Sequence, residues 1–376
     1  MLPRRKIISF SFLVAVALLF LPGILFAAGS NSWTLASPDK QCAISVSLGG
    51  DGTLSYGVSR LGKTVIEPSP LGLLRDDQDF EHSLTFDHAD KVEKHREKYE
   101  LFASTQPRVD HMVYHLSLTF LNANHIPIVL ELAASDEGVA FRYRFTGDSA
   151  DVRVVESELT SFTIPQNASG WMQPYHAAGP YTPAYEDFFF PVSPGDPPPD
   201  SRKQAVGWAF PALFHVPDAA TWVLLTEAGT DASYCACHLN PDCSNGIYRI
   251  AFPLADETTR GYTNQFGPEP RYTLPWTMPW RVMVLGKSAG DIATETFVTD
   301  LSAPSRIADT SWIKPGRASW GWWSYPDGPA TAELFNHFSD FAAKMGWEYT
   351  LFDAGWWTPG LKPIAAHALA EGVMPL

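Results

Sequence analysis

Four side chains near the end of the chain have the types and the spacing of a sugar-binding site. Asp353 follows the run of β-formers "YTLF" at 349–352, and Trp356 comes three residues later. Trp322 and Trp323 follow an earlier run that is also typical of a strand. A carboxylate accepts hydrogen bonds from sugar hydroxyls, and aromatic rings cover the apolar faces of a sugar. The pattern therefore predicts a substrate-binding role, the alternative being an Asp353 that caps the next loop and tryptophans that belong to the core.

A second acidic position lies in the aromatic segment "YTPAYEDFFF", where Glu186 and Asp187 are adjacent. Carboxylate oxygens are the ligands that a hard cation such as Ca²⁺ prefers. Neighbouring residues of an extended segment point to opposite sides, so at most one of the two is expected to face a site. The alternative is a solvated loop acid above packed aromatic rings.

The four cysteines, Cys42, Cys235, Cys237 and Cys243, are compatible with a compartment that permits disulfides. Four cysteines allow three full pairings, and the sequence does not choose among them. A short loop closed onto Cys243 is one interpretation and free thiols are another. Zinc held by the last three cysteines and His238 is a further alternative, although the spacing lacks the usual paired two-residue gaps.

The elements that must position these residues fall into two regions. From Trp33 to about Gly286, short alternating runs such as "VYHLSLTF" and "VAFRYRF" are separated by turn signals, which predicts a large antiparallel sandwich. After 291 the pattern becomes helix at 291–300, strand, helix at 329–344, strand, helix at 365–371 and strand. This order is typical of a parallel α/β fold. A (β/α)8 barrel needs about 250 residues, so the segment predicts only its first two to three strands.

Composition narrows the classes of partner. The net charge is −14 over 376 residues, and after the basic N-terminal residues 4–6 no cluster of lysine and arginine of the kind that such partners demand occurs, which disfavours nucleic acid and anionic membranes. The sequence also lacks the motifs of serine hydrolases, zincins and nucleotide-binding proteins. Neutral ligands such as sugars remain compatible with this charge.

The N-terminus predicts export. Three basic residues precede an apolar stretch at 7–26, and small residues follow it, so we expect a signal peptide at 1–29 and a periplasmic or extracellular location. No other segment is long and apolar enough to span a bilayer once this peptide is removed. The alternative is an uncleaved membrane anchor.

Several segments together resemble glycoside hydrolase family 97, a family of exported α-glucosidases and α-galactosidases. They are "DEGVAFRYRF", "ESELTSFTIP", "YTPAYEDFF", "PALF" with "WVLLTEAG", "TMPWRVMVLG", "SWIKPGRASWGWW" and "MGWEYTLFDAGW". The resemblance implies a β-super-sandwich similar to galactose mutarotase, a catalytic (β/α)8 barrel and dependence on calcium. It assigns a calcium ligand to Glu186 and places Trp322, Trp323, Asp353 and Trp356 at the sugar pocket.

The resemblance also implies a division of the chain and a function. We expect a sandwich domain at 30–290, a helical and proline-containing linker at 291–317 and the truncated start of the barrel at 318–376. The implied activity is hydrolysis of terminal α-glucosidic or α-galactosidic bonds, with catalytic carboxylates expected beyond Leu376 and therefore no activity of this chain alone. A non-catalytic sugar-binding sandwich is the alternative. The segment at 91–102 departs from the family pattern, which puts one local part of the sandwich in doubt.

Overall fold

The computed structural model describes residues 31–102, 104–179, 186–255, 257–259, 262–263, 267–326 and 328–376. The predicted signal peptide and residues 180–185 of the aromatic acidic segment lie outside this part. The chain forms two compact units that divide after Ala303. The two units are described separately below.

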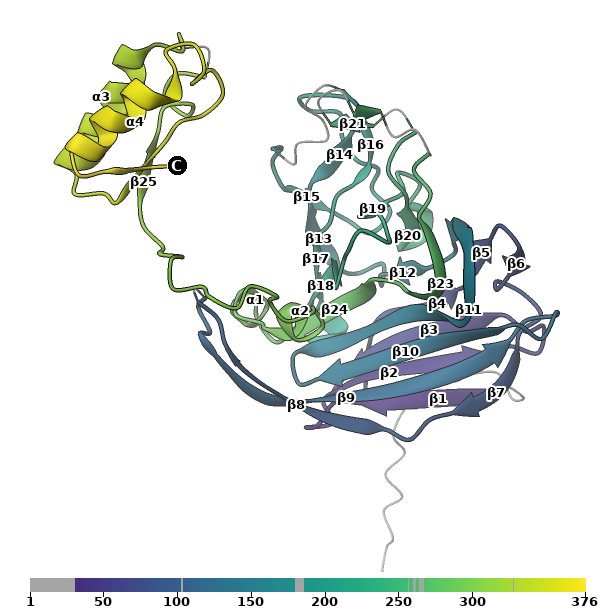
Figure 1. The fold of residues 1–376 in the computed structure, drawn as a ribbon. Helices are drawn as coiled ribbons and strands as arrows, with labels where there is room; N and C mark the ends of the chain where they lie inside the picture. Colours follow the sequence, from purple (N-terminus) through teal and green to yellow (C-terminus); the bar gives the residue numbers. More distant parts are fainter. Residues whose placement is uncertain are drawn as a thin grey trace, which may run out of the picture. The chain divides into compact units, whose positions relative to one another are not determined.

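The larger unit consists of two antiparallel sheets (Figure 1). The first sheet has nine described strands. Strands that follow each other in the sequence often pair as hairpins, as the second and third strands do in the register Cys42↔Arg60 to Leu48↔Leu54. Its strands, in spatial order, are β1 (Asn31–Ala36), β2 (Cys42–Leu48), β3 (Leu54–Arg60), β4 (Lys63–Leu71), β12 (Ser161–Thr163), β20 (Ile247–Ala251), β19 (His238–Leu239), β16 (Ala205–Trp208) and β14 (Pro174–His176).

The second sheet has thirteen described strands and is built around the long strand β11. Its main path is β15 (Phe190–Val192), β13 (Ser169–Met172), β17 (Ala212–Val216), β18 (Thr221–Ala228), β24 (Trp280–Gly286), β11 (Gly138–Glu158), β10 (Pro127–Ser135), β9 (Arg108–Leu121) and β7 (Thr85–Ala89). Attached beside this path are β5 (Leu73–Arg75), β6 (Gln78–Asp79), β8 (Glu93–Glu100) and β23 (Arg271–Thr277). A separate short hairpin pairs β21 (Thr258–Thr259) with β22 (Tyr262–Thr263).

The alternating strands bury one face each against the opposite sheet. In β2 the side chains of Ile44 and Val46 are fully buried, while Ser45 between them is half-buried. Tyr56 of β3 and Phe141 of β11 meet between the sheets with ring centroids 4.8 Å apart. Burying a side chain of this size stabilises a fold by about 1.5–3 kcal/mol. The main core therefore lies between the two sheets, as the period-2 pattern predicts.

The hairpin between β2 and β3 shows why its turn is rich in glycine. Gly52 has φ +76°, and its N–H donates to the Gly49 carbonyl over 3.0 Å. A Cβ at Gly52 would lie 2.5 Å from the Leu84 nitrogen, so glycine is required both by conformation and by close approach. The glycine-rich turn thus joins β2 and β3 as a hairpin.

The segment that departs from the family pattern nevertheless forms a regular strand. β8 pairs with β9 without a register shift, from Glu93↔His115 to Glu100↔Arg108. The strand is largely exposed, so a polar sequence is compatible with it. The doubt raised for this part of the sandwich was wrong.

Two short helices close the larger unit where the sequence predicts one helix at 291–300. Helix α1 (Ala289–Ala293) begins with a capping box in which Ser288 and Asp291 each bond the other's backbone. Helix α2 (Phe297–Asp300) follows, and its Phe297 is fully buried. α1 packs on β24 and α2 on β18, so both helices cover the second sheet.

The smaller unit is a three-stranded parallel sheet with two helices. Its elements are β25 (Ala318–Trp320), α3 (Ala332–Lys344), β26 (Tyr349–Leu351), α4 (Leu361–Ala370) and β27 (Met374–Pro375). β26 lies between β25 and β27, with the registers Ser319↔Thr350 and Tyr349↔Met374. β25 ends at Trp320, and "GWWSY" after it forms turns and bends. The order strand, helix, strand, helix, strand is confirmed.

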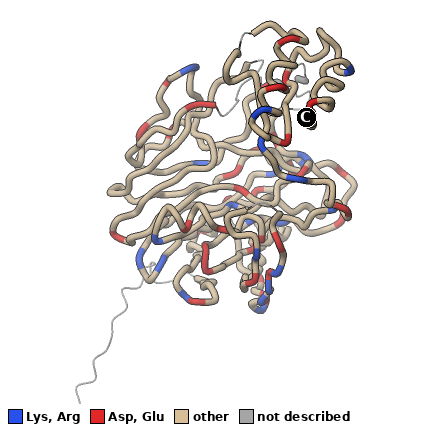
Figure 2. The backbone as a smooth tube through the Cα atoms, turned by 90° about the vertical axis from the view of Figure 1, so that its left-hand side faces the viewer, with Lys and Arg blue, Asp and Glu red and all other residues tan. Residues whose placement is uncertain are grey.

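The fold class is thus mainly β, with antiparallel sheets followed by a short parallel α/β segment and no closed barrel among the described residues. Basic and acidic residues are interspersed along the described backbone (Figure 2). Within the described residues we find no helix with the length and apolarity needed to cross a bilayer.

Candidate functional site

The parallel sheet of the smaller unit brings Asp353 and several tryptophans to the carboxyl ends of its strands. Asp353 lies two residues after β26, and Trp320 is the last residue of β25. The Trp320 indole Nε1 donates to Asp353 Oδ2 over 2.9 Å, and the Ala354 N–H donates to Oδ1 over 2.6 Å. Each carboxylate oxygen keeps a further lone pair for a ligand. Asp353 is therefore held in a fixed orientation and can still accept hydrogen bonds.

The tryptophans around this carboxylate expose their rings to solvent. Trp323 is 81% exposed and Trp322 49%, while Trp356 is 38% exposed. Trp323 lies against Trp320 with ring centroids 6.0 Å apart, and Trp356 lies against Trp357 at 5.9 Å. Exposed aromatic faces next to a fixed acceptor have the chemistry to bind a sugar ring.

Trp322 and Asp353 also line a small cavity of about 70 Å³. At about 30 Å³ for each water in the liquid, this volume corresponds to about two water molecules. It is too small to enclose a sugar ring. In the smaller unit, a sugar would therefore lie over the exposed rings rather than inside this cavity.

The sequence missed the tryptophan that is hydrogen-bonded to Asp353. Trp322, Trp323 and Trp356 were predicted around Asp353, but the tryptophan whose indole donates to its carboxylate is Trp320. Trp320 stands at the end of β25, directly next to the end of β26 in the parallel register Trp320↔Leu351. The signal that could have found it is this pairing of strand ends, which requires the register.

Glu186 and Asp187 point in different directions, as expected for an extended segment. Glu186 is exposed, whereas the Asp187 side chain is 1% exposed. Asp187 accepts hydrogen bonds from His176 Nε2 over 2.9 Å, from the Phe188 N–H over 2.7 Å and from the Ser201 hydroxyl. Burial alone would raise the pKa of Asp187, but these hydrogen bonds hold it below its ordinary value. Asp187 is thus a structural acid, and Glu186 is the one available to a ligand.

The fit of calcium to Glu186 is partial. Ca²⁺ takes six to eight oxygen ligands. Among the described residues, no cluster of three potential metal ligands includes Glu186. Glu186 can contribute one carboxylate, and the described residues around it do not complete a calcium shell.

The cysteines carry no metal site in the described part of the chain. All four are free thiols. None of the three described clusters with metal-ligand spacing contains a cysteine. His238, the fourth member of the zinc alternative, instead stacks on Tyr175 with ring centroids 3.9 Å apart. The zinc interpretation has no support from the structure.

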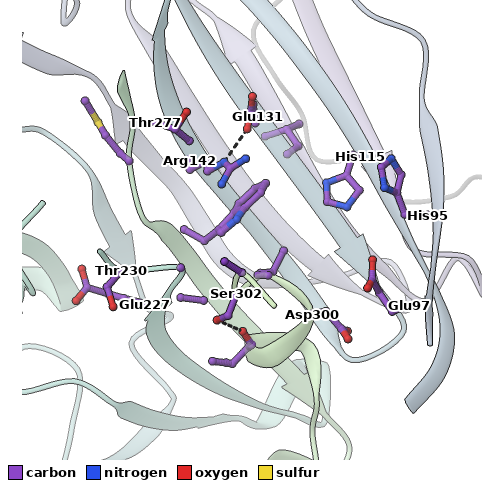
Figure 3. Close-up of a pocket in the computed structure, with 18 of the residues that line it drawn as sticks. His95, Glu97, His115, Glu131, Arg142, Glu227, Thr230, Thr277, Asp300 and Ser302 are labelled. Carbon is purple, nitrogen blue, oxygen red and sulfur yellow. Dashed lines mark hydrogen bonds and ion pairs between the residues drawn. The ribbon is translucent and has the colours of Figure 1, made fainter. Parts of the chain in front are cut away.

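The larger unit holds a cavity of about 880 Å³ that the sequence did not predict (Figure 3). Arg142 and Glu131 lie on neighbouring strands in its wall and pair over 2.6 Å. The Arg142 guanidinium stands 4.3 Å from the centre of the Trp280 ring. Burial, together with the nearby charges of His95 and Arg142, lowers the pKa of His115 to about 4. The wall therefore offers a neutral imidazole beside an ion pair at physiological pH.

Glu227 lines the same cavity but faces the interior network of the sandwich. It pairs with Arg281, and the Cys237 N–H donates to its second oxygen over 3.0 Å. Burial raises the pKa of Glu227, an effect that Arg281 partly opposes. Glu227 and Arg281 face each other in the register of β18 and β24.

Taken together, the chain has an antiparallel sandwich followed by a parallel β/α segment with a fixed carboxylate and exposed tryptophans at its strand ends. These features are those expected of a protein of the carbohydrate-binding or carbohydrate-processing class. The family description "Glycosyl-hydrolase 97 N-terminal" matches residues 35–304. The chain belongs to glycoside hydrolase family 97.

Two curated proteins to which the chain is similar are named as glycosidases. A "Probable retaining alpha-galactosidase" of Streptomyces bingchenggensis is 29% identical over 335 residues, covering 88% of this chain and 48% of that protein. A "Retaining alpha-galactosidase" of Bacteroides thetaiotaomicron is 25% identical over 355 residues, covering 87% and 50%. The chain thus spans about half the length of these curated relatives.

Solved structures agree on the fold. The crystal structure of a beta-arabinopyranosidase matches with a TM-score of 0.80 and 27% identity, covering 91% of this chain and 55% of that one. A glycoside hydrolase family 97 enzyme of Pseudoalteromonas sp. strain K8, solved with panose, matches with a TM-score of 0.74 and 22% identity, covering 91% and 53%. The second likeness concerns the fold alone.

Proposed function

We propose that the chain supplies the sandwich and the first barrel strands of an exported, calcium-assisted glycosidase that hydrolyses terminal α-galactosidic bonds. The two curated relatives are both named as α-galactosidases. An α-D-galactoside and a β-L-arabinopyranoside share their ring configuration and differ by one hydroxymethyl group. The similarity to a beta-arabinopyranosidase is therefore compatible with the same kind of site.

The observation that carries the proposal is the fixed carboxylate at the end of β26. Asp353 is oriented by Trp320 and by the Ala354 N–H, so its orientation is set before a ligand arrives. Preorganised acceptors bind hydroxyl groups at a lower entropic cost than mobile ones. Trp323 and Trp356 supply rings for the apolar face of the sugar. In this proposal Asp353 binds substrate, and the acid and base of the reaction are other residues.

Glu186 is proposed as one ligand of the calcium ion. Its carboxylate is exposed, while its neighbour Asp187 is bound on both oxygens. The bound ion would supply electrostatic stabilisation to the substrate. Export to the periplasm or the exterior remains part of the proposal and rests on the basic and apolar pattern of residues 1–29.

Sugar binding by the chain tests the site. Calorimetric titration with methyl α-D-galactopyranoside should show binding that Trp323→Ala weakens about 2- to 13-fold, since an aromatic contact contributes about 0.5–1.5 kcal/mol. Trp312→Ala is the matched control, because Trp312 is also exposed (68%) in the same unit but lies before β25. Equal affinity in both variants would show that the sugar does not bind at the strand ends.

Hydrolysis tests the sugar preference. Because these 376 residues alone are expected to be inactive, the assay uses the enzyme as its host makes it. That enzyme should release nitrophenol faster from the α-galactoside than from the α-glucoside, and removal of calcium by a chelator should slow the reaction. Faster cleavage of the α-glucoside would reverse the assignment. A rate that the chelator leaves unchanged would remove calcium from the proposal.

A sugar-binding sandwich without catalysis is the second candidate, and the cavity in the larger unit favours it. Its volume of about 880 Å³ lies in the range of small-molecule sites, and Arg142 and His115 present polar groups to it. Binding that Arg142→Ala abolishes and Trp323→Ala leaves unchanged would place the sugar in the sandwich. The opposite pattern would support the barrel strands.

A further inference from the structure

Three side chains from distant parts of the sequence meet where the linker helices join the second sheet. His111 lies on β9, Glu137 in the turn between β10 and β11, and Asp300 at the end of α2. One ligand atom from each lies within 4.8 Å of the other two. His111 Nε2 is 2.6 Å from Asp300 Oδ2, and the Asp300 side chain is 1% exposed. All three residues belong to the larger unit.

Hydrogen bonds from neighbouring residues orient the two carboxylates. The Tyr99 hydroxyl donates to Asp300 Oδ1 over 2.6 Å. The Thr296 N–H and hydroxyl donate to Glu137 Oε2 over 2.8 and 3.1 Å. These contacts occupy Asp300 Oδ1 and Glu137 Oε2, while Asp300 Oδ2 faces His111 Nε2. In metal sites, hydrogen bonds of this kind hold the ligands in the orientation that the ion requires.

The site carries more negative charge than its own residues neutralise. Burial, followed by repulsion from Asp300, raises the pKa of Glu97. Burial, with repulsion from Glu137 and Asp300, also raises the pKa of Glu295. The opposing charges that act on Glu97 come from histidines. Figure 3 shows Glu97 and Asp300 at the same end of the large cavity. A cation placed among these carboxylates would relieve the repulsion.

We propose that His111, Glu137 and Asp300 bind a divalent transition-metal ion, with Zn²⁺ the expected occupant and water completing its coordination. An imidazole nitrogen with two carboxylate oxygens suits Zn²⁺, whereas Ca²⁺ takes oxygen ligands. This ion is therefore distinct from the calcium proposed at Glu186. An ion bound by ligands from β9, from the β10–β11 turn and from α2 would hold helix α2 against the sheet.

His111 Nε2 now faces Asp300 Oδ2 over 2.6 Å. Binding of the ion to the lone pair of this nitrogen releases any proton held there to solvent, so no other reactant is needed.

Calorimetric titration of the full chain with Zn²⁺, after removal of any affinity tag, tests the site. We expect one site per chain, and replacement by Co²⁺ should give a visible absorption band. His111→Gln should abolish this binding. Tyr99→Phe should weaken it by about 10-fold, because it removes a hydrogen bond that orients the ligand Asp300. Saturating Zn²⁺ should raise the melting temperature of the wild type and leave that of His111→Gln unchanged.

The matched control is His367→Gln. His367 belongs to a second described cluster, Asp340, His367 and Glu371, at the surface of the smaller unit. Zinc binding lost in His367→Gln and kept in His111→Gln would overturn the proposal. The same holds if the wild type binds no zinc at micromolar concentration. If His111→Gln does not fold, Glu137→Gln replaces it, because removal of that ligand should also abolish binding. Sugar affinity is measured separately and does not enter this test.

Discussion

A buried ion network in the larger unit allows a quantitative prediction about stability. Arg281 on β24 is 1% exposed and pairs with Glu158 of β11 and Glu227 of β18. Its Nε donates to Glu158 Oε1 over 2.8 Å, and the Tyr234 hydroxyl donates to Glu158 Oε2 over 2.9 Å. Replacement of Arg281 by methionine nearly keeps the side-chain volume and removes the positive charge that pairs with both glutamates. Two buried carboxylates then face each other without a counter-charge.

The expected loss is about 3–5 kcal/mol in the free energy of unfolding, because removing one partner of a buried pair leaves an uncompensated charge. The pH dependence has a defined sign. Burial and Glu158 already raise the pKa of Glu227, and loss of Arg281 raises it further. Protonation then removes the unpaired charge, so the loss should be largest at pH 8 and smaller at pH 5.

Urea unfolding followed by circular dichroism at both pH values measures this loss, with the transition of the larger unit fitted separately. The control is Arg96→Ala, which breaks an exposed pair with Asp110 and should leave the midpoint nearly unchanged. The variant Arg281→Met with Glu158→Gln and Glu227→Gln should regain much of the stability. A loss below about 1 kcal/mol for Arg281→Met, or equal losses at pH 5 and pH 8, would refute the reasoning.

Three further predictions concern a histidine, a tryptophan and a glycine. Burial lowers the pKa of His238 to about 4 from its ordinary 6.5, so its neutral form contributes about 3 kcal/mol above pH 6.5 that is lost as the pH falls to 4. In His238→Phe the urea midpoint should change less between pH 6.5 and pH 4 than in the wild type. An equal change of the midpoint with pH in both proteins would contradict this prediction. Trp320→Phe removes the hydrogen bond from the indole to Asp353 and should weaken binding of the galactoside, measured by calorimetry, about 10-fold. Unchanged affinity would show that this hydrogen bond does not orient Asp353 for the sugar. Gly138→Ala brings a Cβ onto the Met283 carbonyl oxygen and should cost about 1–3 kcal/mol, whereas Gly50→Ala meets nothing within 4 Å and should cost little in the same unfolding assay.

The strand pattern and the change of architecture were predictable from the sequence. The runs at 113–120 and 139–145 lie in β9 and β11, and the turn at Gly52 has the backbone conformation that its glycine indicates. Local rules suffice here. The alternation of apolar and polar residues indicates which face of a strand is buried, and a glycine indicates where φ can be positive. The parallel segment was equally visible, since strand and helix patterns alternate along the chain.

The boundaries of strands near the site were less predictable. The run "ASWGWWSY" has the composition of a strand, yet only Ala318–Trp320 is one, and the tryptophans that follow lie in turns. Aromatic residues favour strands when they pack on a pleated surface, and this preference depends on neighbours rather than on the residue itself. Trp322 and Trp323 are exposed, so no such surface holds them.

By itself, the sequence determined the two kinds of architecture and the position of Asp353 after a strand. The tertiary structure alone decided which groups contact one another. Trp320 reaches Asp353 across 33 positions, Arg281 reaches Glu158 across 123, and His111 reaches Asp300 across 189. A residue pattern records the face that a side chain occupies, whereas its partner depends on strand register and on the packing of distant segments. The candidate metal ligands and the charged core therefore became visible only in the folded chain.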